Sequence, residues 1–275
     1  MRSVVLGCVA YDAKVVPIWE GFRAYLEDRR LPFDYVLYSN YERQVESHLR
    51  GEINVAWNSP LAWIQTEQAA RARGRWAEAI AMRDTDCDLT SVVVVKANGP
   101  IAEVADLQGK RIGVGAADSP QATLIPLGEL AEAGVQCTVV NHDVHLGKHG
   151  DHVGGERDAV RALLADKVDA ACLIDSNRLA FAREGLFAPN DLRVVLQTGK
   201  YDHCNFTVLD GAPPLIAKFR ELLLAMSYED PAVRPLLDME GLKQWRPGRK
   251  TGYALLERAI ERFGTLKTWL AEHSE

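Results

Sequence analysis

Apolar residues along this chain follow two patterns that alternate from one segment to the next. Short continuous runs such as residues 4–10 predict buried strands, and longer segments such as 17–29 place Trp19, Phe22 and Leu26 at helical spacing. Strands that alternate with helices are typical of doubly wound, mostly parallel sheets, whose ligands bind at the carboxyl ends of the strands. The sequence therefore predicts an α/β fold.

The alternation continues along the chain and indicates two lobes. A polar segment at 83–88 interrupts it, and we expect a strand at 205–209 to return to the first lobe. We expect lobe 1 to comprise residues 1–86 plus 204–275, and lobe 2 residues 87–203. The predicted strands are 4–10, 33–38, 53–57, 78–82, 90–96, 111–114, 138–140, 170–174, 193–197 and 205–209, and the predicted helices are 17–29, 42–50, 60–73, 121–132, 157–165, 179–184, 214–226, 232–238 and 253–262.

One stretch, residues 110–130, predicts an anion-binding site. A short strand at 111–114 is followed by a tight turn, and Ser119 is a good N-cap with Pro120 at the first helical position. The first N–H groups of a helix have no partners within the helix and lie at the positive end of its dipole, so they stabilise an oxyanion. An ordinary capped helix explains this stretch equally well.

Further polar or aromatic residues follow the predicted strands, where ligands of α/β proteins bind. In a two-lobed protein such strand ends converge on the cleft between the lobes. A cap or turn role explains any one of these residues, whereas the whole set favours a ligand site. The candidates are Tyr11, Asp12, Tyr41, Trp57, Asn58, Asp86, Asp118, Ser119, Gln121, Glu156, Arg157, Asp175, Asp202 and His203.

Four histidines lie between residues 141 and 155, where two of them, His145 and His149, would share one face of a helix and recruit a metal ion. Glycines in the same segment argue against a helix. We therefore expect a solvated loop or lid and no metal site. The other two histidines are His142 and His152.

His203 stands beside Cys204, which raises the question of a nucleophile and its base. Adjacent residues in an extended segment point to opposite faces, so we expect Cys204 to be packed rather than activated. No Ser-His-Asp signature, Walker loop or GxGxxG motif is visible, and we expect no cofactor.

Composition narrows the class of partner. The chain has 275 residues, 47% hydrophobic and 25% charged, with a net charge of −6 and no basic block, which argues against nucleic acid. No apolar run approaches the ~20 residues that span a bilayer.

Five scattered cysteines without a Cys-x-x-Cys pair argue against a disulfide framework. No secretory signal is visible, so we expect a cytoplasmic protein as the sequence stands, and a periplasmic one if an export signal was trimmed.

Several segments, in order and at compatible spacing, resemble one known family. They are 39–41, 49–56, 106–112, 126–130, 158–160 and 168–171, together with Asn58-Ser59-Pro60-Leu61-Ala62-Trp63, which is similar to the stretch D-V-A-x-x-x-P-x-A-Y. The family comprises the phosphate, phosphite and phosphonate substrate-binding proteins of bacterial ABC importers, within the type II periplasmic binding fold. The resemblance spans nearly the full length and implies a two-lobed clamshell.

The resemblance also implies site residues. The family's Tyr after the first crossover matches Tyr41, and its Asp after the last crossing strand matches Asp202. Its Ser-Thr-Ser anion loop falls on Ser119-Pro120-Gln121, where Pro120 removes one backbone donor.

Two further positions depart from the family's pattern: Arg157 replaces a His, and Leu89 replaces an aromatic residue. These departures favour a ligand that has an acidic group at Ser119 and a polar or cationic group facing Asp86, Asp202 or Glu156.

Two hypotheses remain open. The favoured one is a solute-binding protein that closes on a small anionic or zwitterionic ligand by a hinge motion near Asp86 and Lys200. An ABC-transporter permease is then a partner if the chain is exported. The alternative is a cytoplasmic enzyme that resembles chorismate dehydratase or the thiamin-pyrimidine synthase, with Asp202, His203 and Glu156 as acid and base.

Overall fold

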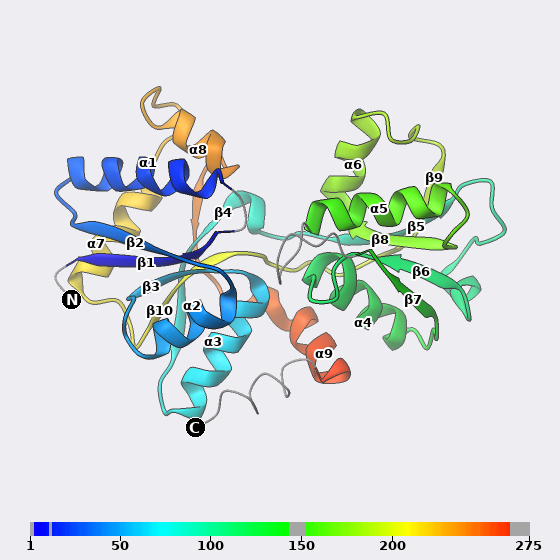
Figure 1. Ribbon diagram of the computed structural model, residues 1–275, viewed down its shortest axis with the longest axis horizontal. Helices are drawn as coiled ribbons and strands as arrows, with labels where there is room; N and C mark the ends of the chain where they lie inside the picture. Colours follow the sequence, from blue (N-terminus) through cyan, green and yellow to red (C-terminus); the bar gives the residue numbers. More distant parts are fainter. Residues whose placement is uncertain (1–2, 11–12, 143–151, 265–275) are drawn as a thin grey trace. The chain divides into compact units, whose positions relative to one another are not determined.

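A computed structural model describes residues 3–10, 13–142 and 152–264 of the protein, with the side chains of His152 and Val153 excepted. Within this part of the chain, contacts define two compact units (Figure 1). Unit 1 contains residues up to Cys87 and then Asp202–Tyr253, and unit 2 contains Asp88–Tyr201 and the segment that begins at Ala254. None of the described helices is both long and apolar enough to cross a bilayer.

Unit 1 is built on a six-stranded sheet in the order β11-β4-β10-β3-β1-β2. β1 runs parallel to β2 and β3, whereas β10 is antiparallel to β3 and β4. The sheet is mixed because β10 returns from the second unit in the opposite direction. The strands are β1 (Val4–Val9), β2 (Phe33–Tyr38), β3 (Val55–Asn58), β4 (Ala77–Arg83), β10 (Asn205–Leu209) and β11 (Trp245–Pro247).

Helices cover both faces of this sheet (Figure 1). α1 (Val15–Asp28), α7 (Pro214–Leu224) and α8 (Arg234–Glu240) pack on one face, and α2 (Tyr41–Leu49) and α3 (Pro60–Ala72) lie on the other. The helical spacing of Trp19, Phe22 and Leu26 is confirmed, since all three are buried in the core beneath α1.

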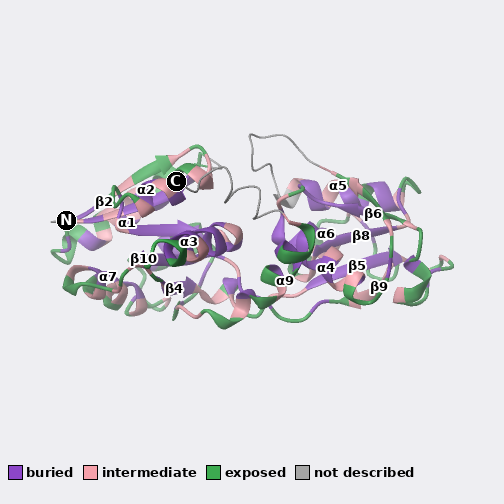
Figure 2. Ribbon diagram, turned by 90° about the horizontal axis from the view of Figure 1, so that it is seen from below, coloured by how far each residue is buried: buried purple, intermediate pink, exposed green. Residues whose placement is uncertain are grey.

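Unit 2 has a five-stranded sheet in the order β7-β6-β8-β5-β9. β5 is antiparallel to β8 and β9, whereas β6 is parallel to β7 and β8. Buried residues concentrate on β5, β6 and β8 in the middle of the sheet (Figure 2). The strands are β5 (Ser91–Lys96), β6 (Arg111–Val114), β7 (Thr138–Asn141), β8 (Ala170–Ile174) and β9 (Leu192–Gln197).

The continuous valine run in β5 contributes to two cores, because alternate side chains of a strand point to opposite faces. Val92 and Val94 pack with α5 (His152–Leu164) and α6 (Asp175–Arg183), and Val93 and Val95 pack on the α4 side (Ile125–Glu132). The α/β class predicted from the sequence is confirmed, with antiparallel pairs more frequent than expected.

The last described helix, α9 (Ala254–Phe263), differs from the expected arrangement, in which it stayed with lobe 1. It packs on α4, where a Cβ added to Gly128 would lie 3.1 Å from Cβ of Ala259. Arg258 Nε also donates to Glu132 Oε1 at 3.0 Å. The amphipathic pattern of α9 predicts a helix, whereas the surface that it covers depends on a close approach at Gly128.

Candidate functional site

The predicted anion-binding turn lies between β6 and α4 in unit 2. Ser119 is its N-cap: Oγ accepts from the Ala122 N–H at 3.2 Å, while the Ser119 N–H donates to Ala116 O at 3.0 Å. The expected α-helix from residue 121 instead begins with a π-helical turn, Pro120–Leu124, in which Ser119 O accepts from the amides of residues 123 and 124 at 3.2 and 3.0 Å.

A second proline explains the local widening of this helix. Pro126 has no N–H to donate to the carbonyl of Ala122, four residues earlier. That carbonyl accepts from Gly115 N–H instead, at 3.3 Å, which ties the turn to the end of β6. Ser119 is 0% exposed, and its hydroxyl, which accepts from Ala122, still has its own hydrogen to donate.

A buried hydrogen-bond network holds the turn in place. Ser91 Oγ, at the start of β5, donates to Gln121 O at 2.5 Å and lies 2.7 Å from Tyr201 Oη. Burial raises the pKa of the Tyr201 phenol, which stays neutral. Sequence reasoning missed Ser91 as a site residue, although the hydroxyl pair Thr90-Ser91 just before a valine run is a signal for it.

The start of α5 lies beside the same turn. A Cβ added to Gly115 would contact Ser119 Cβ and the Glu156 backbone N, each at 3.9 Å, and one added to Gly155 would lie 2.5 Å from His142 O. Gly154 and Gly155 lie within α5, which spans His152–Leu164, and the missing side chain of Gly155 permits this close approach. The side chain of His145 and its neighbours at 143–151 lie outside the described residues.

Glu156 is buried at the N-terminus of α6. Its Oε2 accepts from Ile174 N–H at 3.1 Å and from Asn177 Nδ2 at 2.8 Å, a favourable place for a carboxylate because of the helix dipole. Arg157 forms an ion pair with Glu184 and lies 4.4 Å from the centroid of the Phe181 ring. Asp175 accepts from Arg178 Nε at 2.7 Å, and Asp118 is half-buried.

In unit 1, Asp86 belongs to a buried charge cluster. Arg83 Nε and Nη2 donate to its two carboxylate oxygens at 2.5 and 3.0 Å, and Arg83 Nη1 lies 3.3 Å from Glu240 Oε1. Burial opposes ionisation of Asp86, but Arg83 and His203 outweigh it and lower its pKa to about 2. Burial raises the pKa of Glu240 to about 7, against the attraction of Arg83.

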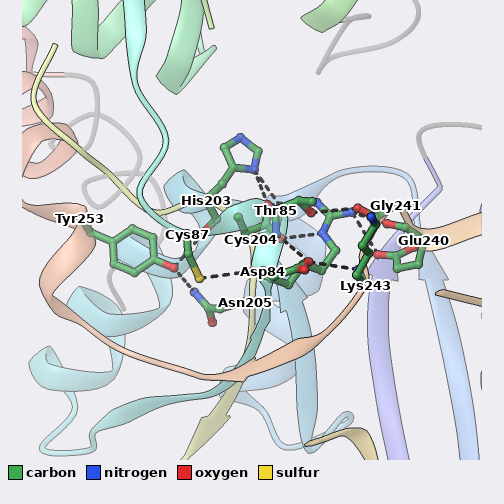
Figure 3. Close-up of polar contacts among 12 residues, drawn as sticks. Asp84, Thr85, Cys87, His203, Cys204, Asn205, Glu240, Gly241, Lys243 and Tyr253 are labelled. Atoms are coloured by element: carbon green, nitrogen blue, oxygen red, sulfur yellow. Dashed lines mark hydrogen bonds and ion pairs between the residues drawn. The ribbon is translucent and has the colours of Figure 1, made fainter. Parts of the chain in front are cut away.

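His203 contacts both Asp86 and Cys204. Figure 3 labels His203 and Cys204 within this group of polar contacts. Its Nδ1 lies 3.2 Å from Cys204 Sγ and 3.4 Å from Asp86 Oδ1. The expectation that His203 and Cys204 point apart was wrong, because both precede β10 and do not follow strand alternation. Burial lowers the pKa of His203, but Cys204 and Asp86 reverse the shift and raise it.

This arrangement does not form a nucleophile relay. A Cys-His-Asp relay uses the two ring nitrogens separately, one for the nucleophile and one for the carboxylate. Here both neighbours approach Nδ1. As possible metal ligands, the three residues place one donor atom each within 4.8 Å of one another.

Asp202, a buried carboxylate, forms an ion pair with a partly exposed arginine that sequence reasoning missed. Arg249 Nε and Nη2 donate to its two carboxylate oxygens, both at 2.6 Å. The Asp202 N–H donates to Gly252 O at 2.8 Å. The run Arg246-Pro247-Gly248-Arg249-Lys250 is the available sequence signal, but nothing in its spacing identifies Asp202 as the partner.

The other predicted site residues of unit 1 lie on or near β3. Trp57 is 6% exposed and packs among Trp19, Phe206 and Trp245. Asn58 is buried and donates to Thr207 Oγ1 at 2.8 Å, and Tyr41 opens α2. Tyr11 and Asp12 lie outside the described residues. The ligand roles of the residues named from the sequence stay predictions.

Solved structures share this fold over nearly the whole chain. PhnD1 from Prochlorococcus marinus, in complex with methylphosphonate, has a TM-score of 0.68 at 17% identity and covers 96% of this chain and 98% of its own. XAC2383 from Xanthomonas citri, bound to ATP, has a TM-score of 0.68 at 19% identity and covers 100% of both chains. The aliphatic sulphonate binding protein SsuA from Escherichia coli has a TM-score of 0.56 at 17% identity and covers 98% of this chain and 88% of its own.

These likenesses define a two-lobed α/β protein of the type II periplasmic binding class. The family model "ABC transporter, phosphonate, periplasmic substrate-binding protein" matches residues 9–253, so the chain belongs to that family. The resemblance stated from the sequence is confirmed. The protein is a solute-binding protein for small anionic ligands, as the favoured hypothesis expected.

Proposed function

We propose that the solute is a zwitterion, whose acidic group is held at the Ser119 turn and whose cationic group is attracted by Glu156. The proximity of Glu156 to Ser119 supports this proposal: the start of α5 and the turn both adjoin Gly115. A buried carboxylate beside an anion site disfavours a simple anion, and a cationic group on the ligand offsets that repulsion. Pro120 acts in the same direction, since it removes one backbone donor.

The test compares two ligands of nearly equal shape. We expect 2-aminoethylphosphonate to bind at least tenfold more tightly than propylphosphonate in calorimetry, since only the first carries an ammonium group, and tenfold is about 1.4 kcal/mol. Glu156→Gln should reduce this preference, and Asp158→Asn, which removes an exposed carboxylate nearby on α5, should not. Equal affinities for the two phosphonates would contradict the proposal of a zwitterionic solute but not the anion site. If neither phosphonate nor ethanesulfonate binds, both the zwitterion and the anion site are contradicted.

Binding rather than catalysis is the function that the side chains support. Asp202 and Glu156, two of the three acid and base candidates of the enzyme alternative beside His203, accept hydrogen bonds from Arg249 and from Ile174 and Asn177. Carboxylates that are held by such hydrogen bonds are suited to a structural or binding role. The protein should return 2-aminoethylphosphonate unchanged after prolonged incubation, as monitored by phosphorus NMR, and a new phosphorus signal would support the enzyme alternative.

An ABC-transporter permease is the partner that membership of this family supports, with the periplasm as the place of action. Detergent-solubilised permease from the same cell should be retained by the immobilised, ligand-loaded protein and released by an excess of soluble protein. Equal retention of the permease on a column that carries an unrelated protein would contradict the partnership.

A further inference from the structure

Three potential metal-ligand atoms of unit 1 lie close to one another. His203 Nδ1 is 3.2 Å from Cys204 Sγ and 3.4 Å from Asp86 Oδ1. Around tetrahedral zinc, bonds of about 2.0 Å to nitrogen and oxygen and about 2.3 Å to sulfur place such atoms about 3.3 to 3.5 Å apart. The Cys204 and Asp86 donor atoms lie within 4.8 Å of each other, so all three donors can surround one ion after a modest rearrangement.

Hydrogen bonds of the main chain hold these three residues in place. His203 N–H donates to Asp86 O at 2.8 Å, and Tyr253 Oη donates to His203 O at 2.8 Å. The segments that contain Asp86 and Cys204 are thereby held side by side. Cys204 is 7% exposed, whereas the His203 side chain is 22% exposed and gives access from solvent.

The donor set selects the kind of ion. A thiolate, an imidazole and a carboxylate suit zinc and its cobalt substitute, whereas calcium and magnesium prefer oxygen ligands. Arg83 offsets the charge of Asp86, so a Cys204 thiolate supplies the further negative charge that a divalent ion needs. Asp86 Oδ1 accepts from Arg83 and still has a lone pair for a metal, because a carboxylate has about four acceptor positions.

We propose that Asp86, His203 and Cys204 form a binding site for a zinc-class divalent ion, with one further coordination position for water or an exogenous ligand. On binding, the Cys204 thiol and any proton on His203 Nδ1 are released to water, and no electron is transferred. The site differs from the Ser119 turn, to which none of its three residues belongs.

Cobalt titration of the full, reduced protein tests the site. We expect one equivalent of Co²⁺ to give the near-ultraviolet charge-transfer absorption of a cobalt–thiolate bond and the intense visible bands of a tetrahedral ion. Cys204→Ser should abolish the charge-transfer band. Cys137→Ser, a half-buried thiol of unit 2, should leave it unchanged. His203→Gln should weaken cobalt affinity at least tenfold.

X-ray absorption on the zinc-loaded wild-type protein tests the same site without any variant. One sulfur and three nitrogen or oxygen neighbours are expected. No charge-transfer band, a band that persists in folded Cys204→Ser, or a first shell without sulfur would each overturn the proposal. Circular dichroism establishes that each variant is folded.

Discussion

Ser119 and Ser59 form the same N-cap hydrogen bond. Each is an N-cap followed by proline, and each Oγ accepts the N–H of the alanine three residues later, at 3.2 and 3.3 Å. The two caps thus provide a matched pair of substitutions. One lies in the predicted anion site of unit 2 and the other begins α3 in unit 1.

Ser119→Ala and Ser59→Ala should each destabilise the protein by about 1 kcal/mol, because each removes one cap. Only Ser119→Ala should also weaken the binding of 2-aminoethylphosphonate, by about tenfold, since the Ser119 hydroxyl is expected to donate to the ligand. Urea unfolding and calorimetry measure the two effects. Equal loss of affinity in both variants would show that Ser119 acts only as a cap.

The Asp202–Arg249 pair should matter more for stability than an exposed pair. Arg249→Met leaves a buried carboxylate without its cation and should cost about 3 kcal/mol in the free energy of unfolding. Arg258→Met removes the exposed pair with Glu132 and should cost less than about 1 kcal/mol. Urea unfolding at one pH compares the two variants, and similar costs would mean that Asp202 is not desolvated as described.

Gly252 permits the close approach of the chain to Asp202. A Cβ at this position would lie 2.0 Å from Asp202 Oδ2, so Gly252→Ala should destabilise by about 1–3 kcal/mol through overpacking. Gly199→Ala is the control, because its Cβ would contact Leu255 Cδ1 at 3.2 Å, the end of a flexible side chain. A shift in thermal midpoint that is equal for the two variants would contradict this account.

His48 should make the protein sensitive to mild acid. It is 2% exposed, and neither ring nitrogen has a hydrogen-bond partner in the part of the chain that the structure describes. Burial, assisted by Arg75, lowers its pKa to about 3. The unfolded state therefore binds the proton more readily, so stability is present above the unfolded pKa of about 6.5 and is lost as pH falls towards 3.

The contribution of His48 corresponds to about 2 kcal/mol between pH 7.5 and pH 5. His48→Gln should lose less stability over this interval than the wild type by about that amount, as measured by urea unfolding at both pH values. Comparison of the two proteins cancels the other titrating groups. A difference near zero would show that His48 is protonated in the folded state.

The sequence by itself determined the elements and the family. Strand and helix signals depend on spacings of two to four residues, which local sterics and one-sided burial impose, so the valine run of β5, the apolar face of α1 and the Ser119 cap could all be predicted. The order of family-like segments such as Asn58-Ser59-Pro60 identified the binding-protein class in the same way.

Only the tertiary structure decided which distant groups meet. Asp202 pairs with Arg249, Ser91 supports the Gln121 turn, and α9 packs on α4. The contact of His203 with Cys204 likewise depends on how the chain enters β10, not on strand alternation. These contacts depend on burial, and those of α9 and Asp202 also depend on the absence of a Cβ at Gly128 and Gly252. Both are properties of packing between segments far apart in the sequence, so no local pattern of residues specifies them.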